Sequence, residues 1–128
     1  MKMFLYLLQL LSVVVILGGN ALAADKKAEN QAYFSVLTDI PLMPDMKEMT
    51  DQGFVFDKAE GRVVGAVGFL SAPHALDPLK FYETALPPLG WKPLKTGVFR
   101  RNNEQLVVRA EKLTQGVVVK FQLSPMSR

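Results

Sequence analysis

Hydrophobic and polar residues alternate with a period of two along the last third of the chain. This pattern predicts a short strand at Val98 to Arg101 and longer strands at Gln105 to Leu113 and Val117 to Leu123, with tight turns between them. On the longer pair, the apolar face that we expect to cover the core carries Leu106, Val108, Ala110, Val117, Val119, Phe121 and Leu123. The opposite face carries Gln105, Arg109, Glu111, Val118, Lys120 and Gln122.

Two apolar runs precede this block, Gly53 to Lys58 and Arg62 to Leu70. The turn Ala59-Glu60-Gly61 separates them, so they are predicted to form a hairpin. The second run is apolar on both of its faces, which is typical of a central strand or of one whose outer side is covered. Its two glycines, Gly65 and Gly68, indicate a bulge or a close backbone approach.

Between the two blocks the period becomes helical. Asp77 is a favourable N-cap, and Pro78 suits the first helical position. The apolar stripe consists of Leu79, Tyr82, Ala85, Leu86 and Leu89. Pro87 and Pro88 stop the helix, and a glycine then lets the chain reverse into Trp91, which we expect to anchor the core with a partner for its indole N–H. These patterns predict an α+β fold, one helix on a mostly antiparallel sheet in the order ββαβββ.

The first 23 residues have the features of a cleavable export signal. Lys2 supplies a positive start, Met3 to Leu17 is a nearly continuous apolar run, and Ala21-Leu22-Ala23 is a small-x-small cleavage site. An uncleaved membrane anchor is the alternative, but a span takes about 20 apolar residues and this run is no longer than that. The sequence therefore predicts a periplasmic protein that meets the membrane only through this segment, before cleavage.

The rest of the chain is predicted to be a flexible mature N-terminus over 24–39, one small α+β domain over 40–125 and a tail over 126–128. The stretch from Tyr33 to Met49 is nevertheless too apolar for a free linker. Pro41 and Pro44 exclude a regular helix or strand across it. We therefore interpret it as an extended arm that packs on the domain.

Composition restricts the chemistry. The 128 residues include 15 basic and 12 acidic side chains, a balance that does not predict a nucleic-acid partner. The absence of cysteine excludes disulfides, thiolate metal sites and a thiol nucleophile. The single histidine, His74, follows Ser71-Ala72-Pro73 in a predicted loop, and no serine stands in a Gly-x-Ser-x-Gly elbow. We expect neither an enzyme nor a bound cofactor.

Two patterns suggest a small-ligand carrier. The methionines of Met43-x-x-Met46-x-x-Met49 offer soft thioether ligands of the kind that select Cu(I), although the same spacing also serves packing on one side of a turn. The aromatic residues around the helix offer a site for an apolar ligand between helix and sheet, at Phe81, Tyr82 and Trp91.

The hypothesis that we favour from the sequence is a non-catalytic interaction module of the cell envelope. It is motivated by the strand with two apolar faces, the arm rich in proline and methionine, and the lack of a catalytic constellation. The expected docking patch lies on the outer sheet surface and consists of Arg62, Val64, Ala66, Leu70, Arg109 and Lys120.

The segment FYETALPPLGWKP follows a strand rich in glycine and valine, and the final hairpin closes on FQLSP. This combination resembles a group of small exported proteobacterial proteins of unknown function that share an FYxxxLPxLGW motif. The likeness covers roughly Ile40 to Pro125. It implies the helix, its stop and the buried tryptophan, together with an envelope location, and implies no chemistry.

Overall fold

The computed structural model describes residues 31–72 and 76–126. The predicted export signal lies outside the described residues, and so does His74. From Ala32 onward the chain forms one compact unit.

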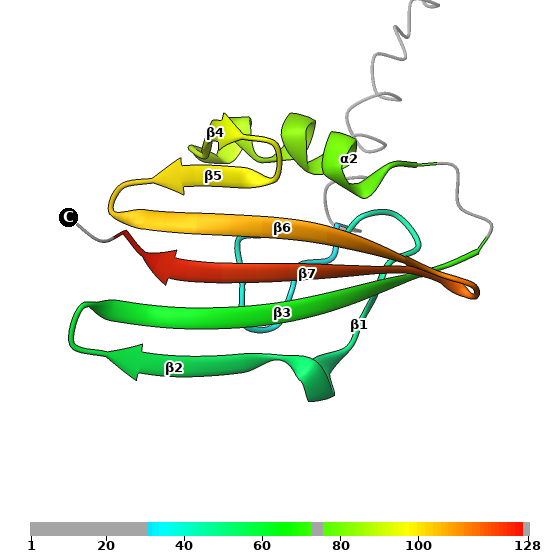
Figure 1. The fold of residues 1–128 in the computed structure, drawn as a ribbon, viewed down its shortest axis with the longest axis horizontal. Coiled ribbons are helices and arrows are strands. Elements are labelled where there is room, and N and C mark those ends of the chain that lie inside the picture. The colour runs from blue at the N-terminus through cyan, green and yellow to red at the C-terminus, as the bar shows by residue number, and fades with distance from the viewer. Residues whose placement is uncertain (1–30, 73–75, 127–128) are drawn as a thin grey trace, which may run out of the picture. The chain divides into compact units, whose positions relative to one another are not determined.

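This unit is an antiparallel sheet with one α-helix in the described part of the chain (Figure 1). Its elements are β1 (Lys47–Glu48), the 3₁₀ turn η1 (Thr50–Gln52), β2 (Phe54–Lys58), β3 (Gly61–Ser71), α2 (Pro78–Ala85), the 3₁₀ turn η2 (Pro87–Leu89), β4 (Lys92–Lys95), β5 (Val98–Arg101), β6 (Glu104–Leu113) and β7 (Gly116–Pro125). The predicted α+β class, with one helix on a mostly antiparallel sheet, is confirmed.

The predicted order ββαβββ is wrong, because the sheet has seven strands. The two unpredicted strands are β1 and β4. β1 is only two residues long and comes shortly after Pro44, and β4 reads Lys-Pro-Leu-Lys. Neither has enough alternating apolar residues to give a period-two pattern, so only their pairing with a neighbour makes them strands.

The strand order is β1-β3-β7-β6-β5-β4, and β2 also pairs with β3. Residues 64–71 of β3 pair with β7 on one side, so β1 and β2 lie along its other side, with η1 between them. One edge of the sheet is therefore formed by β1 and β2, and the other by β4. The register places Val64 opposite Leu123, Ala66 opposite Phe121 and Leu70 opposite Val117.

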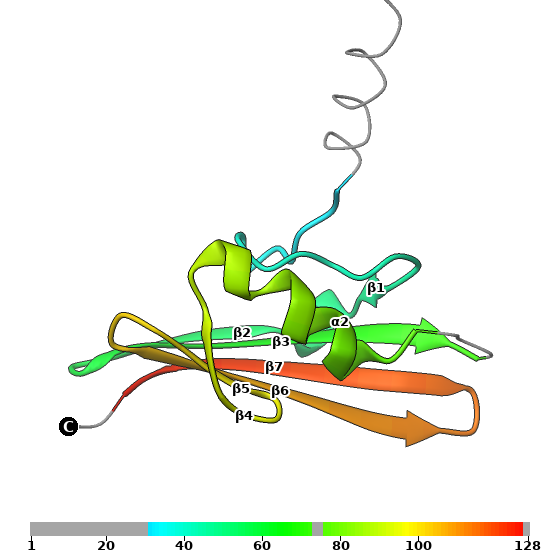
Figure 2. The ribbon, with the colours of Figure 1, turned by 90° about the horizontal axis from the view of Figure 1, so that it is seen from above.

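The helix α2 and residues 32–46, which we call the arm, lie on the same face of the sheet (Figure 2). The core fills the space between them and the strands. Its buried residues are Phe34, Leu37, Ile40, Met43, Met46, Val64, Ala66, Leu70, Tyr82, Leu86, Trp91, Phe99, Leu106, Val108, Val119, Phe121 and Leu123. The sequence prediction for the covered face of β6 and β7 is confirmed by five of these residues.

The arm belongs to the core, so the prediction of a flexible segment up to residue 39 is wrong for residues 32–39. Phe34 is 1% and Leu37 3% exposed, and each fully buried side chain of this kind contributes about 1.5–3 kcal/mol. Backbone hydrogen bonds close the arm into a loop, with the Phe34 N–H donating to the Ile40 carbonyl at 3.1 Å. The Ser35 hydroxyl donates to Glu48 Oε1 at 2.7 Å and fastens this loop to β1.

The helix begins and ends as its sequence predicts. The side chain of Asp77 accepts a hydrogen bond from the Leu79 N–H at 3.0 Å, and Pro78 is the first helical residue. After the two prolines of η2, Gly90 takes a left-handed φ of 94°, which a residue with a Cβ adopts at a cost. This reversal directs Trp91 into the core, where it is 1% exposed.

Tyr82 joins helix, arm and sheet. Its hydroxyl donates to the Pro41 carbonyl oxygen of the arm at 2.7 Å, and its ring meets that of Phe121 on β7 edge-on, with 4.9 Å between centroids. The hydroxyl also lies 3.8 Å from the sulfur of Met46. Burial raises the pKa of the Tyr82 phenol above its ordinary value, so the hydroxyl remains a donor at neutral pH.

We expect Tyr82→Phe to lower the free energy of unfolding by about 1–2 kcal/mol, because it leaves the buried Pro41 carbonyl without this donor while keeping the ring. Urea denaturation of the purified protein measures the change. Tyr33→Phe is the matched control, since Tyr33 is 49% exposed, and should change the value by less than about 0.5 kcal/mol. Equal effects of the two substitutions would contradict the role given to Tyr82.

Candidate functional site

The six residues of the expected docking patch do not form one surface. Val64, Ala66 and Leu70 are 0%, 2% and 0% exposed and lie under the helix and arm. Arg109 and Lys120 lie on the opposite, uncovered face, where they are directly opposite each other in register. The patch as predicted is therefore wrong.

The patch was placed wrongly because the covered face of β3 was taken for its outer face. Arg62 also belongs to the covered-face set of β3, because it alternates in step with Val64. Apolar residues occur on both faces of β3, so its sequence does not say which face the helix covers. Choosing the wrong face of a strand moves every side chain of the set to the other side of the sheet.

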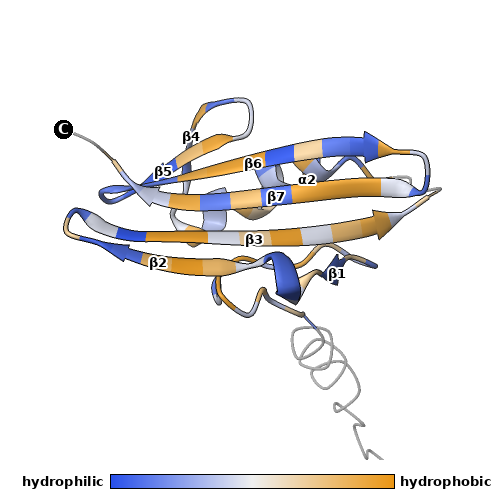
Figure 3. Ribbon diagram, turned by 60° about the horizontal axis from the view of Figure 1, so that its bottom comes forward, coloured by the Kyte–Doolittle hydropathy of each residue, from blue (hydrophilic) through white to orange (hydrophobic). Residues whose placement is uncertain are grey.

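The uncovered face of the sheet, which we call the open face, is seen in Figure 3 with α2 behind the strands. Neither α2 nor the arm lies over it (Figures 2 and 3), and the 3₁₀ turn η1 contributes only Gln52 at its β2 side. It is hollowed at its centre, over β3, β7 and β6, with a volume of about 450 Å³. The hollow is lined by Gln52, Phe54, Gly65, Val67, Gln105, Val107, Arg109, Lys120, Gln122 and Ser124. The lining also includes Ala66 and Phe121, which belong to the core cluster.

Sequence reasoning placed Arg109 and Lys120 on this face but missed its apolar part. Phe54 projects from β2 over Gly65, where an added Cβ would lie only 2.2 Å from the ring. Gly65 was predicted to mark a bulge or a close backbone approach, but what approaches it closely is the side chain of Phe54. Val67 and Val107 complete the apolar part. In the sequence, the apolar residues at the odd-numbered positions of β3 indicated that this surface has an apolar part.

Of the three aromatic residues expected to hold an apolar ligand, two are buried in the core and one is half-buried. Tyr82 and Trp91 are 0% and 1% exposed and belong to the core. Phe81 packs edge-on against Tyr82, with 5.0 Å between ring centroids, and is half-buried. It lines a second hollow, of about 520 Å³, on the outer side of α2 together with Leu76 and Ala85.

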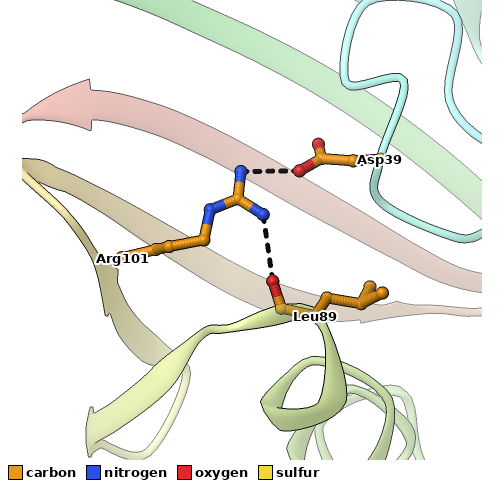
Figure 4. A network of polar contacts seen from close by, with 3 residues as sticks. All are labelled: Asp39, Leu89 and Arg101. Atoms are coloured by element: carbon orange, nitrogen blue, oxygen red, sulfur yellow. Dashed lines mark hydrogen bonds and ion pairs between the residues drawn. The ribbon is translucent and has the colours of Figure 1, made fainter.

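Trp91 is stacked beneath an arginine that connects three parts of the fold. The Arg101 guanidinium lies 4.2 Å from the indole centroid. It also forms an ion pair with Asp39 of the arm at 2.6 Å and donates to the Leu89 carbonyl of η2 at 3.2 Å (Figure 4). The indole N–H finds no acceptor among the described residues, contrary to the expected partner.

Two of the three methionines that suggested copper are in the core. Met43 is 2% and Met46 7% exposed. The Met46 sulfur packs on Gly68, where an added Cβ would clash with it. Met49 is half-buried and continues the backbone pairing with β3, its N–H donating to the Val67 carbonyl at 2.8 Å. Packing accounts for the burial of Met43 and Met46.

Over the part of the chain that the structure describes, no group of three histidine, cysteine, aspartate or glutamate side chains is placed to hold a metal ion. Within the same residues, none of the helices has the length and apolar character needed to cross a membrane.

Comparison of the chain with models of protein families, with curated proteins and with solved structures finds no match. The assignment of function therefore depends on the geometry of the two faces and the two edges of the sheet.

We expect Arg101→Lys to lower the free energy of unfolding by about 1 kcal/mol, because lysine loses the planar stack on Trp91 and the forked contact to Asp39 and Leu89. Thermal denaturation followed by circular dichroism is a suitable measurement. Arg100→Lys is the neighbouring control on an exposed residue and should leave the midpoint nearly unchanged. A midpoint for Arg101→Lys as high as that of the control would show that the stack contributes nothing.

Proposed function

We propose that this chain is a non-catalytic interaction module of the cell envelope and that it binds a partner polypeptide along the edge strand β2. The envelope location rests on the sequence of the first 23 residues. The mode of binding is supported by one observation, which is the difference between the two edges of the sheet.

The β4 edge carries the features that prevent another strand from pairing. It holds Lys92, Pro93 and Lys95, all of them exposed, and its register with β5 shifts between Pro93 and Lys95. Lysine, proline and an irregular register are the usual means by which a soluble protein protects an edge strand.

The β2 edge lacks this protection over its first three residues. Phe54, Val55 and Phe56 are 49%, 50% and 57% exposed, and all five residues of β2 are exposed. The charged residues of β2, Asp57 and Lys58, are its last two residues. Within the described residues β2 pairs with β3 alone, so its other side presents unpaired backbone groups to a further strand.

Strand addition uses these groups directly. The backbone hydrogen bonds of an added strand supply affinity, and its alternate side chains supply specificity. Phe54 and Phe56 project to the open face and Val55 to the other face, because they pair with Gly65, Val63 and Val64 respectively. An extended partner segment would therefore meet two aromatic rings on one side and one valine on the other.

Site-specific photo-cross-linking in the intact envelope tests this assignment. A photoreactive residue in place of Val55 should give a discrete cross-linked partner, because this position is at the unprotected edge. The matched control replaces Leu94 of β4, which is equally exposed at 52%. We expect no specific product from position 94.

A second variant tests the strand pairing itself. With the photoreactive residue at position 56, Val55→Lys should abolish the product, because a lysine on the edge opposes pairing, while the stability of the fold changes by less than about 0.5 kcal/mol. An unchanged product from this variant, an equal product from position 94, or a product that contains only a second copy of this chain would each contradict the proposal.

A further inference from the structure

The hollow of the open face contains two cations that the fold itself does not require. Arg109 on β6 and Lys120 on β7 are directly opposite each other, an arrangement that destabilises a sheet when both residues carry the same charge. Among the described residues Arg109 takes part in no ion pair. Lys120 lies 3.6 Å from Glu111, but both side chains are more than half exposed, so this pair is weak.

The remaining polar lining of the hollow does not neutralise these cations. It consists of three glutamines and Ser124, and the lining includes no carboxylate. Amide and hydroxyl groups can donate hydrogen bonds to an anion, whereas an aspartate or glutamate would repel it. The charge of the hollow is therefore complementary to a negatively charged group.

The other part of the hollow is apolar. Val67 on β3 is directly opposite Lys120 and is 7% exposed, so it lies at the floor of the hollow beside the cations. The Phe54 ring lies over Gly65 at the β2 side, and Val107 lies on β6. The volume of about 450 Å³ is in the range of small-molecule sites, which are about 300–1,000 Å³.

We propose that this hollow binds a medium-chain alkyl carboxylate, that is, a free fatty acid. The carboxylate lies between Arg109 and Lys120, and the alkyl chain runs over Val67 and Gly65 toward the Phe54 ring. This site shares Phe54 with the β2 edge, but its cations are on β6 and β7 and it needs no polypeptide partner.

Laurate is the probe, titrated below its micelle concentration into the purified chain and followed by isothermal titration calorimetry. Binding should shift the amide resonances of Gly65, Val67 and Lys120 in a ¹H–¹⁵N spectrum. Arg109→Gln and Lys120→Gln should each weaken binding at least about tenfold, since each removes a charge-assisted hydrogen bond. Arg109→Gln should also be at least as heat-stable as the wild type, because it removes the like-charge pair.

The matched control is Arg62→Gln, which removes an exposed arginine from the other face of the sheet and should leave the affinity unchanged. Val55→Lys should also leave it unchanged, which separates this site from the proposed partner edge. Absence of laurate binding, equal affinity for dodecyltrimethylammonium, or equal weakening by Arg62→Gln would overturn the proposal. Tighter binding of a hexaglutamate peptide than of laurate would also overturn it, and would assign the hollow to an acidic polypeptide.

Discussion

The phenol of Tyr82 joins the three parts of the molecule that must meet to enclose its core. Its hydroxyl donates to the Pro41 carbonyl of the arm, its ring packs on Phe121 of the sheet, and its backbone belongs to α2. An eight-residue helix is too short to cover a wide sheet and has little stability of its own. The arm supplies the missing cover, and Tyr82 holds it beside the helix. Arg101 makes a second connection between arm and sheet, through Asp39.

Covering one face in this way leaves the other face exposed to solvent. An antiparallel sheet tolerates this arrangement when its outer face is polar, and β6 and β7 meet that condition. The open face departs from it at the β2 and β3 side, where Phe54, Phe56 and Val67 lie. The like-charged residues Arg109 and Lys120, which lie opposite each other, are a second departure of the open face from this arrangement. Both departures reduce the stability or solubility of the isolated fold, and each lies at one of the two binding sites that we propose.

The elements that could be predicted from the sequence are those with a local physical cause. Asp77, Pro78 and Gly90 determine where the helix starts and where the chain reverses, and the period of two in β6 and β7 determines their core-facing side. These features require no knowledge of distant residues. The burial of Trp91 follows from them as well, because the chain reversal at Gly90 carries it under the helix.

The features that could not be predicted depend on pairing between distant segments. β1 and β4 are strands only because β3 and β5 lie beside them. The covered face of β3 is decided by its register with β7, which the apolar residues on both of its faces do not reveal. For that reason Arg109 and Lys120 were placed on the open face correctly, whereas Val64, Ala66 and Leu70 were not. The open-face hollow was missed with them, because its floor is formed by the alternate residues of β3.

Hydroxyl-radical footprinting with mass spectrometry tests the one-sided cover most directly, because it reports the exposure of individual side chains in solution. If the arm and helix cover one face and leave the other open, Tyr82, Trp91 and Phe121 are protected, while Phe54 and Phe56 are oxidised at rates expected for half-exposed rings. Oxidation of Tyr82 and Phe121 at rates like those of Phe54 and Phe56 would contradict the account, since it would mean that the arm and the helix do not enclose this face.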